Sequence, residues 1–153
     1  MLNKRVTEIM TESPIDTIER GLTTSLAASV MKDRARGCLV VVDSGKPIGI
    51  ITERGILRRI VALNKQPEKI LCKNIMSRPL KIIYPDNAVL EAIERMSKYN
   101  IKKLIVTENK ELVGVLSVTD IIKSGQKIED DALKKLARLY PICRPVDSEK
   151  PFT

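Results

Sequence analysis

The chain has 153 residues, of which 43% are apolar and 30% charged, a composition typical of a folded globular protein and not of a disordered chain. Its formal net charge is +8, which attracts nucleic acid, phosphorylated small molecules and acidic proteins alike. No apolar stretch approaches the length of a membrane span, and no apolar segment follows the first five residues. We therefore expect a cytoplasmic protein with no membrane partner.

The residues that carry most catalytic and metal chemistry are scarce. There is no histidine, and the three cysteines, Cys38, Cys72 and Cys143, are not closely spaced. This argues against a disulfide framework and against a zinc site. Without a nucleophile–base pair or a phosphate-binding glycine loop, we expect no catalytic residues, no metal, no required cofactor and no enzymatic activity.

The first half follows a strand, helix, strand, turn, strand, helix pattern after a lead-in of residues 1–13. The predicted elements, in order, are a strand at 14–18, a helix from about 23 that ends at Gly37, an apolar buried strand at 38–42, a hairpin turn at 43–46, a returning strand at 48–51 and a helix opened by Thr52. Cys38 begins the apolar run, so we interpret it as a small buried side chain.

The same pattern starts again after a polar stretch at residues 64–69. From Pro14 onward the offset is constant at 65 residues (79 − 14) without a gap. Several pairs at this offset are identical: Pro14/Pro79, Ile18/Ile83, Ala27/Ala92, Met31/Met96, Leu39/Leu104, Val41/Val106, Gly49/Gly114 and Ile56/Ile121. We therefore predict an α/β (α+β) fold of tandem β-α-β-β-α repeats, with boundaries at 1–66 and 67–125.

A third segment, residues 126–153, lies outside the repeat. Its acidic residues at 129–131 stand where the first turn of a helix favours them, and an amphipathic stripe follows up to Pro141, which predicts a C-terminal helix. Two interpretations stay open for this helix, packing on the core or binding a partner. We expect residues 145–153 to be loosely held.

The most informative stretch is Gly114–Asp120, where a strand runs into a helix. Ser117 and Asp120 have the spacing of a capping box, which many helices carry without any ligand. However, Gly49–Gly55 repeats this stretch, with Thr52 in the place of Ser117. In the first copy Gly55 stands where the second has its acid.

This duplicated motif, with a hairpin before each copy, resembles the CBS (cystathionine-β-synthase-type) domain, and a tandem pair resembles a Bateman module. The resemblance covers roughly residues 5–125. It implies two small sheets packed pseudo-symmetrically around two related clefts. It also implies a regulatory sensor of an adenosine-containing ligand (AMP, ADP, ATP or S-adenosylmethionine) and a homodimer. Because the sequence shows no effector domain, we expect either a separate effector protein or a dimer that is itself the output.

The resemblance also implies roles for particular residues. Asp120 would accept the ribose hydroxyls, and Ser117 and Thr119 would contact ribose or phosphate. The adenine would lie against the first strand, and the residues that we expect to contact it there are Ile15 and Thr17.

Basic residues before each central strand are candidates for phosphate contacts. They are Lys102 and Lys103 in the second repeat and Arg34 and Arg36 in the first. Solvated charge at a helix end is an equally good interpretation of all four.

The second cleft would be formed by Thr52 and Arg54, with Leu80 and Ile82 opposite. Because Gly55 replaces its acid, we predict that this cleft is weak or empty.

An alternative function is nucleic-acid binding, which the net charge of +8 favours. The sequence contains no recognised nucleic-acid-binding motif, and it has few aromatic residues for base stacking. The candidate phosphate contacts for this function are Arg34, Arg36, Arg58, Arg59, Lys102 and Lys103.

Overall fold

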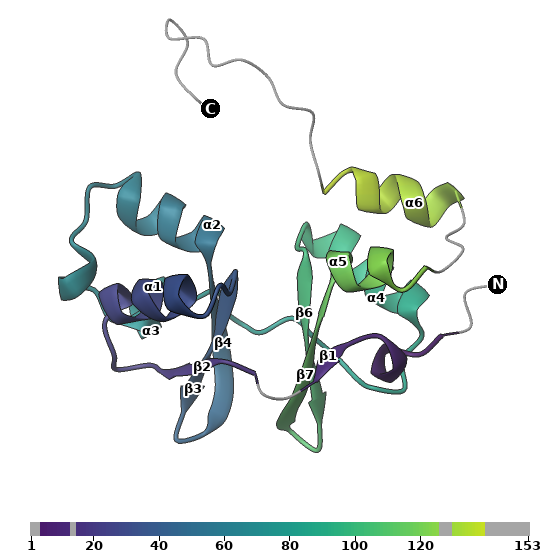
Figure 1. Cartoon of the computed structure of the whole chain (residues 1–153), viewed down its shortest axis with the longest axis horizontal. Coiled ribbons are helices and arrows are strands. Elements are labelled where there is room, and N and C mark those ends of the chain that lie inside the picture. Colours follow the sequence, from purple (N-terminus) through teal and green to yellow (C-terminus); the bar gives the residue numbers. More distant parts are fainter. Residues whose placement is uncertain (1–3, 13–14, 126–129, 140–153) are drawn as a thin grey trace, which may run out of the picture.

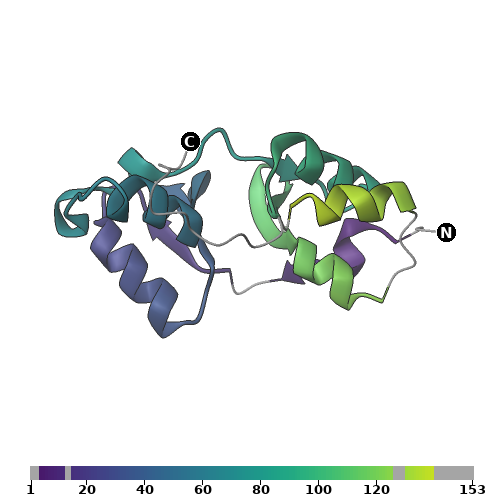
Figure 2. The same ribbon diagram turned by 90° about the horizontal axis from the view of Figure 1, so that it is seen from above.

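The computed structural model describes residues 4–12, 15–125 and 130–139. The chain forms two similar halves that lie side by side, each a small sheet with helices on its outer face (Figure 1). The view from above shows the two sheets facing each other at the centre and the helices on the two flanks (Figure 2). This confirms the expected α+β architecture of paired repeats.

The first sheet has the strand order β2-β3-β4. β2 (Thr17–Glu19) runs parallel to β3 (Cys38–Asp43), and β3 pairs antiparallel with β4 (Lys46–Thr52). Helix α1 (Thr24–Asp33) connects β2 to β3, and the Thr23 hydroxyl caps it by accepting a bond from the Leu26 N–H. After β4 the chain enters α2 (Glu53–Ile56), which continues as the π-helical turn η2 (Leu57–Val61).

The second sheet has the order β1-β7-β6-β5. Its repeat-derived strands are β5 (Ile82–Ile83), β6 (Lys103–Glu108) and β7 (Glu111–Ser117). Helix α4 (Val89–Tyr99) precedes β6, and helix α5 (Val118–Lys123) follows β7. Both hairpins shift register at equivalent points, Val41/Val42 in the first and Val106/Thr107 in the second, so the duplication extends to the irregularities of the strands.

The fourth strand of this sheet comes from the start of the chain. After the short turn η1 (Val6–Glu8), β1 (Thr11–Glu12) pairs antiparallel with β7, and Val6 lies in the core of the second repeat. Conversely, η3 (Pro67–Lys69) and α3 (Cys72–Ile75) lead into the second repeat but pack on the first, where Cys72 and Ile75 are buried. The repeats therefore exchange their lead-in segments, and the packing units differ from the sequence boundaries at 66 and 125.

Two glycines allow this exchange. The side chain of Met10 lies against Gly114, and that of Met76 lies against Gly49, so close that an added Cβ would be 2.7 Å and 2.5 Å from the respective sulfur atoms. The glycine of each repeat thus receives the methionine that opens the other. Only a residue without a side chain leaves this space.

Three apolar clusters hold the molecule together. Two lie between a sheet and its helices, one in each half. The third lies between the sheets, where Val40, Val42 and Ile105 are buried among half-buried neighbours that include Ile15, Leu80 and Ile82. This central cluster holds the two sheets face to face.

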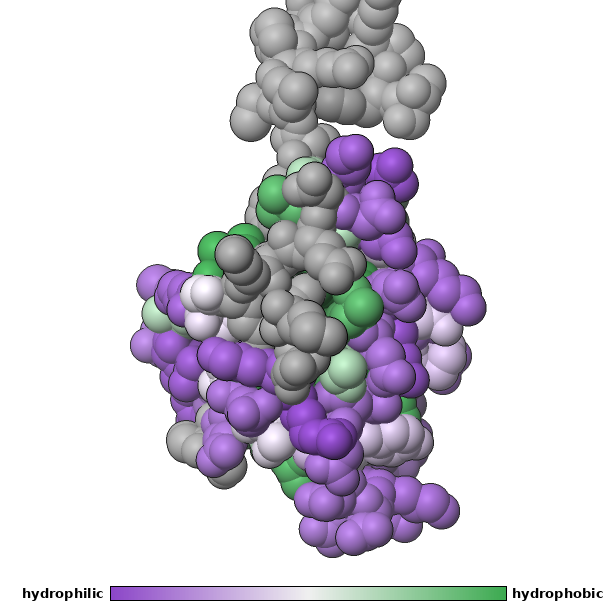
Figure 3. All heavy atoms as spheres, turned by 90° about the vertical axis from the view of Figure 1, so that its right-hand side faces the viewer, coloured by the Kyte–Doolittle hydropathy of each residue, from purple (hydrophilic) through white to green (hydrophobic). Residues whose placement is uncertain are grey.

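The C-terminal helix α6 (Asp130–Ala137) lies over α4 and α5 of the second repeat (Figures 1 and 2). Ala132, Leu136 and Leu139 join the core of that repeat, so the helix packs back on the core. The side of the second repeat that Figure 3 shows is largely hydrophilic. The predicted end of this helix at Pro141 and the predicted loose segment at 145–153 lie outside the described residues, as does residue 128. In the part of the chain that the structure describes, no helix has the length and apolar content of a membrane span.

Candidate functional site

A cavity of about 400 Å³ lies between the two repeats, with walls from both. Five of the seven residues predicted for the Asp120 cleft line it: Ile15, Lys103, Ser117, Thr119 and Asp120. The sheet-to-sheet packing brings these residues together from opposite ends of the chain. A cavity of this size is within the range of small-molecule sites.

The carboxylate of Asp120 is held by its own helix terminus. Its Oδ2 accepts a bond from the Ser117 backbone N–H at 2.8 Å, and the Ser117 hydroxyl accepts one from the Asp120 N–H at 3.1 Å. The capping box expected from the sequence is thus present, and it fixes the carboxylate at the cavity wall. The two interpretations of this motif are compatible, because capping occupies only one carboxylate oxygen.

The other oxygen of Asp120 faces a hydroxyl from the other end of the chain. Thr11 Oγ1 donates to Asp120 Oδ1 over 3.4 Å, a long hydrogen bond, and Thr11 lines the same cavity. Asp120 Oδ1 therefore already accepts from a hydroxyl group, which is the chemistry that a ribose would supply.

A second carboxylate, that of Asp16, lies in the same cavity and is bound by two arginines. Arg34 Nη1 donates to Oδ1 at 2.6 Å, and Arg36 Nε donates to Oδ2 at 2.7 Å. The Asp16 side chain is only 12% exposed. The hydrogen bond from Arg34, opposed by burial and reinforced by Arg36, holds the pKa of Asp16 below its ordinary value.

The amine of Lys103 lies against Gly37, the residue that follows Arg36 in the chain. A Cβ placed on Gly37 would be 2.9 Å from Lys103 Nζ, so the amine occupies the space that the missing side chain leaves. Arg36, Gly37 and Lys103 all line the cavity. The residues that line the cavity therefore include two cations, one contributed by each repeat.

Cys38 was predicted to be buried and is instead half-buried at this wall of the cavity. Cys72 is fully buried, and burial raises its pKa to about 11, which keeps the thiol protonated. Of the two cysteines described, only Cys38 faces the candidate site.

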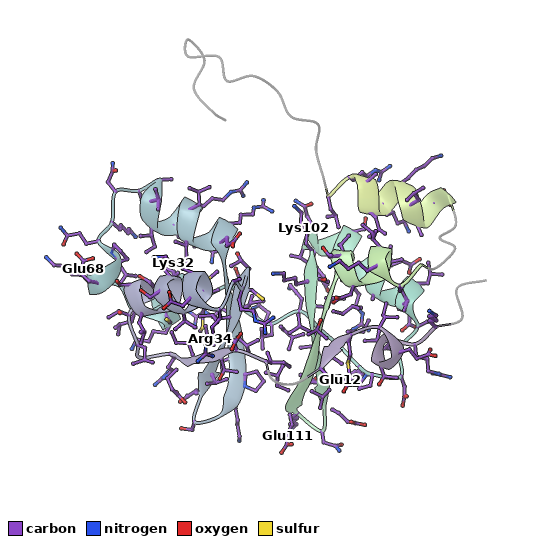
Figure 4. The ribbon with its side chains drawn as sticks, in the orientation of Figure 1. Glu12, Lys32, Arg34, Glu68, Lys102 and Glu111 are labelled. Atoms are coloured by element: carbon purple, nitrogen blue, oxygen red, sulfur yellow. The ribbon has the colours of Figure 1, made fainter. Side chains whose placement is uncertain are left out.

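Two predicted residues do not line this cavity. Thr17 is exposed at the start of the edge strand β2, whereas Ile15 precedes that strand. Lys102, which is labelled in Figure 4, is exposed just before β6. Its neighbour Lys103 lines the cavity. Adjacent residues at the start of a strand point to opposite sides, and only the three-dimensional register selects between them.

The four residues predicted for the second cleft lie at the start of α2 and beside the central apolar cluster. Thr52 caps α2 by accepting the Gly55 N–H at 3.0 Å, and Arg54 is exposed. Leu80 and Ile82 are half-buried against the central cluster between the sheets. No carboxylate occupies position 55, so the first repeat lacks the acceptor that Asp120 provides in the second.

Seven residues that line the main cavity were not predicted as ligand contacts, and three of them, Thr11, Asp16 and Cys38, carry a polar or titratable side chain. Thr11 belongs to a lead-in whose crossing to the other repeat no local pattern revealed. Asp16 could have been found from the sequence, because it is an acid between Ile15 and Thr17, the two residues predicted to contact the adenine. Arg36 was named as a candidate, and it lines the cavity.

The comparisons with known proteins identify the family. The CBS domain matches residues 6–62 and 72–127, which cover the two repeats found in the fold. The chain therefore belongs to the CBS domain family and carries a pair of these domains.

Relatives and solved structures agree with this assignment. An uncharacterized protein of Methanopyrus kandleri is 32% identical over 118 residues, which are 76% of this chain and 57% of that protein. The chain thus spans a little over half the length of that curated relative. A conserved CBS domain protein of unknown function from Thermoplasma acidophilum has the same fold, with a TM-score of 0.78 at 23% identity over 90% of this chain and 76% of that one.

A hexameric CBS-CP12 protein from bloom-forming cyanobacteria is also similar. It is 28% identical, with a TM-score of 0.74 over 82% of this chain and 73% of that chain. Neighbours of this fold therefore include assemblies of several subunits.

Proposed function

We propose that this CBS-domain pair is a regulatory sensor that binds one adenosine-containing ligand in the cavity beside Asp120. The observation that carries the proposal is the cavity itself, whose lining combines the fixed carboxylate of Asp120 with the cations of Arg36 and Lys103. Ribose hydroxyls would donate to Asp120 and replace the long bond from Thr11. The phosphate would lie by Arg36 and Lys103, and the base by the apolar side chains of Ile15 and Val40.

The ligand candidates are AMP, ADP, ATP and S-adenosylmethionine. Calorimetric titration of each into the intact protein tests the proposal, and we expect about one molecule bound per chain. Asp120→Ala should weaken binding at least about tenfold, because a hydrogen bond to a charged group contributes about 1.5–3 kcal/mol. Asp86→Ala removes an exposed aspartate that does not line the cavity, so it should bind as the unchanged protein does.

Unchanged affinity in Asp120→Ala, or two equal sites per chain, would contradict the proposal. A thermal melt of each variant separates lost binding from lost folding, since Asp120 also caps α5.

Signalling requires a second component, because ligand binding acts on a partner only by favouring one of two states. We propose a homodimer that acts on a separate effector protein. Leu57, Val61 and Leu63 follow α2 and are 58–59% exposed, which provides apolar surface for such contacts. Sedimentation velocity with and without nucleotide tests this part, and a monomer under both conditions would contradict it.

The alternative, nucleic-acid binding, has weaker structural support. Two of its candidate phosphate contacts use an Nη group for hydrogen bonds within the chain: Arg34 binds Asp16, and Arg59 binds the Ile75 carbonyl and the Ser77 hydroxyl. A filter-binding assay with an oligonucleotide across salt concentrations distinguishes the two functions, because phosphate contacts produce a steep salt dependence.

A further inference from the structure

An anionic ligand would share the cavity with a carboxylate that already engages its cations. Asp16 accepts from Arg34 through one oxygen and from Arg36 through the other. Arg36 uses Nε for this bond, so its two Nη groups are not part of it. The same guanidinium can therefore bind Asp16 and present the Nη groups to a phosphate.

The second repeat indicates which of these two bonds is structural. At the 65-residue offset, Asp16 and Arg34 correspond to Lys81 and Tyr99, and Lys81 Nζ lies 4.2 Å from the centre of the Tyr99 ring. Both repeats thus tie the first strand to the end of the following helix, one by an ion pair and one by a cation–π contact. Arg36 has no cationic counterpart, since Ile101 stands at its equivalent position. The Arg36–Asp16 bond is therefore particular to this cavity.

The charges around the cavity come close to cancelling. Asp16 and Asp120 are anionic, whereas Arg36, Lys103 and the Asp16-bound Arg34 are cationic, which leaves one net positive charge. The phosphate of a nucleoside monophosphate, which carries about −1.5 to −2 at neutral pH, already exceeds this one positive charge. Each further phosphate adds negative charge that meets Asp16 without a matching cation.

We infer that Asp16 is a specificity-determining residue that limits the anionic charge the cavity accepts, so that the ligand is a nucleoside with a single phosphate and not a triphosphate. This inference rests on the proposed function. It assigns Asp16 a role in choosing among the adenosine-containing ligands, which the ribose and base contacts alone do not distinguish.

The experiment measures the affinities of adenosine, AMP and ATP for the intact protein in magnesium-free buffer. The unchanged protein should bind AMP more tightly than adenosine, and ATP no more tightly than AMP. Asp16→Asn removes the charge and keeps an oxygen acceptor for Arg36. We expect it to raise the affinity for ATP about tenfold and leave that for adenosine within about twofold, because Coulomb interactions scale with ligand charge.

A matched control removes an aspartate from a different arginine pair. Asp43 pairs with Arg20 at 3.6 Å, with both side chains about half exposed, and neither residue lines the cavity. Asp43→Asn should leave the preference between ATP and AMP unchanged. Arg36→Gln provides a second variant if Asp16→Asn does not fold, and it should weaken AMP about tenfold while sparing adenosine.

The outcomes distinguish failure of the proposed function from failure of the role assigned to Asp16. If none of the three compounds binds the unchanged protein, the proposed function fails, and the inference fails with it. If all three bind but Asp16→Asn leaves the ATP-to-AMP preference unchanged, or if the unchanged protein binds ATP tenfold better than AMP, only the inference is overturned.

Discussion

The two repeats share one scaffold and differ in the groups placed on it. Each has a strand that ends in a hydroxyl residue, and that hydroxyl caps the following helix, Thr52 in the first repeat and Ser117 in the second. Three residues later the first repeat has Gly55, and the second has Asp120. Capping therefore needs only the hydroxyl, whereas the carboxylate adds an acceptor at the cavity. The residues that the two repeats share in type form the fold, whereas those that differ between the repeats form the candidate site.

The lead-in segments show the same division. Allowing for the one residue fewer before Pro79, Thr11 corresponds to Ser77. The Thr11 hydroxyl donates to Asp120, whereas the Ser77 hydroxyl accepts from Arg59 at 3.1 Å. Equivalent hydroxyls thus meet an acid in one half and a guanidinium in the other. Only the half with the acid offers a ribose acceptor.

The outer faces differ as well. Helix α6 packs on the second repeat through Ala132 and Leu136, which lie in its core, and the helices of the first repeat have no counterpart of α6 among the described residues. Beside α6, however, Ile122 stays as exposed (58%) as Leu57 (59%), its counterpart in the first repeat. The largest expected effect follows from the packing of α6. Leu136→Ala should destabilise the protein by about 2–4 kcal/mol, because Leu136 is 3% exposed within the core of the second repeat.

Urea denaturation measures this effect, and Leu133→Ala is the control on the same helix. Leu133 is 53% exposed, so its truncation should change stability by less than about 0.5 kcal/mol. Equal losses in the two variants would show that α6 does not pack as described.

A smaller effect is expected where the lead-ins cross. A Cβ on Gly114 would lie 3.0 Å from the Thr11 carbonyl oxygen, whereas the closest neighbours of one on Gly49 all belong to the Met76 side chain. A methionine side chain can move aside more easily than backbone paired in a sheet. Gly114→Ala should therefore cost about 2–3 kcal/mol and Gly49→Ala about 1 kcal/mol in unfolding free energy. The reverse order in thermal or urea unfolding would contradict the exchanged packing.

The smallest effect comes from giving the first repeat its missing acid. Gly55→Asp would place a carboxylate three residues after the Thr52 cap and complete a capping box, and the new Cβ would lie 3.3 Å from Thr52 Oγ1. We expect stability to rise by about 0.5 kcal/mol. Nucleotide stoichiometry should stay at one per chain, because Ile101 and Lys81 still replace Arg36 and Asp16. A second site of similar affinity, measured by calorimetry, would mean that the acid alone distinguishes the clefts.

Much of the fold could be predicted because its signals are local and occur twice. The buried strands at Cys38–Asp43 and Lys103–Glu108, the hairpins and the hydroxyl caps were all visible as short patterns at a constant offset. The exchanged lead-ins could not be predicted in this way. Val6 and Met10 have the composition of a short apolar face that any nearby core would accommodate, and nothing within the segment specifies which repeat receives it.

The candidate site divides along the same line. The sequence by itself determined that the chain is duplicated and that only one copy keeps its acid, because both are read by aligning the chain with itself. Only the tertiary structure decided that Asp120 shares a cavity with Thr11, which lies 109 residues away, and with the Asp16–Arg36 pair. Burial of the central apolar cluster brings the two sheets together, and no local pattern encodes which polar side chains then meet at their edge.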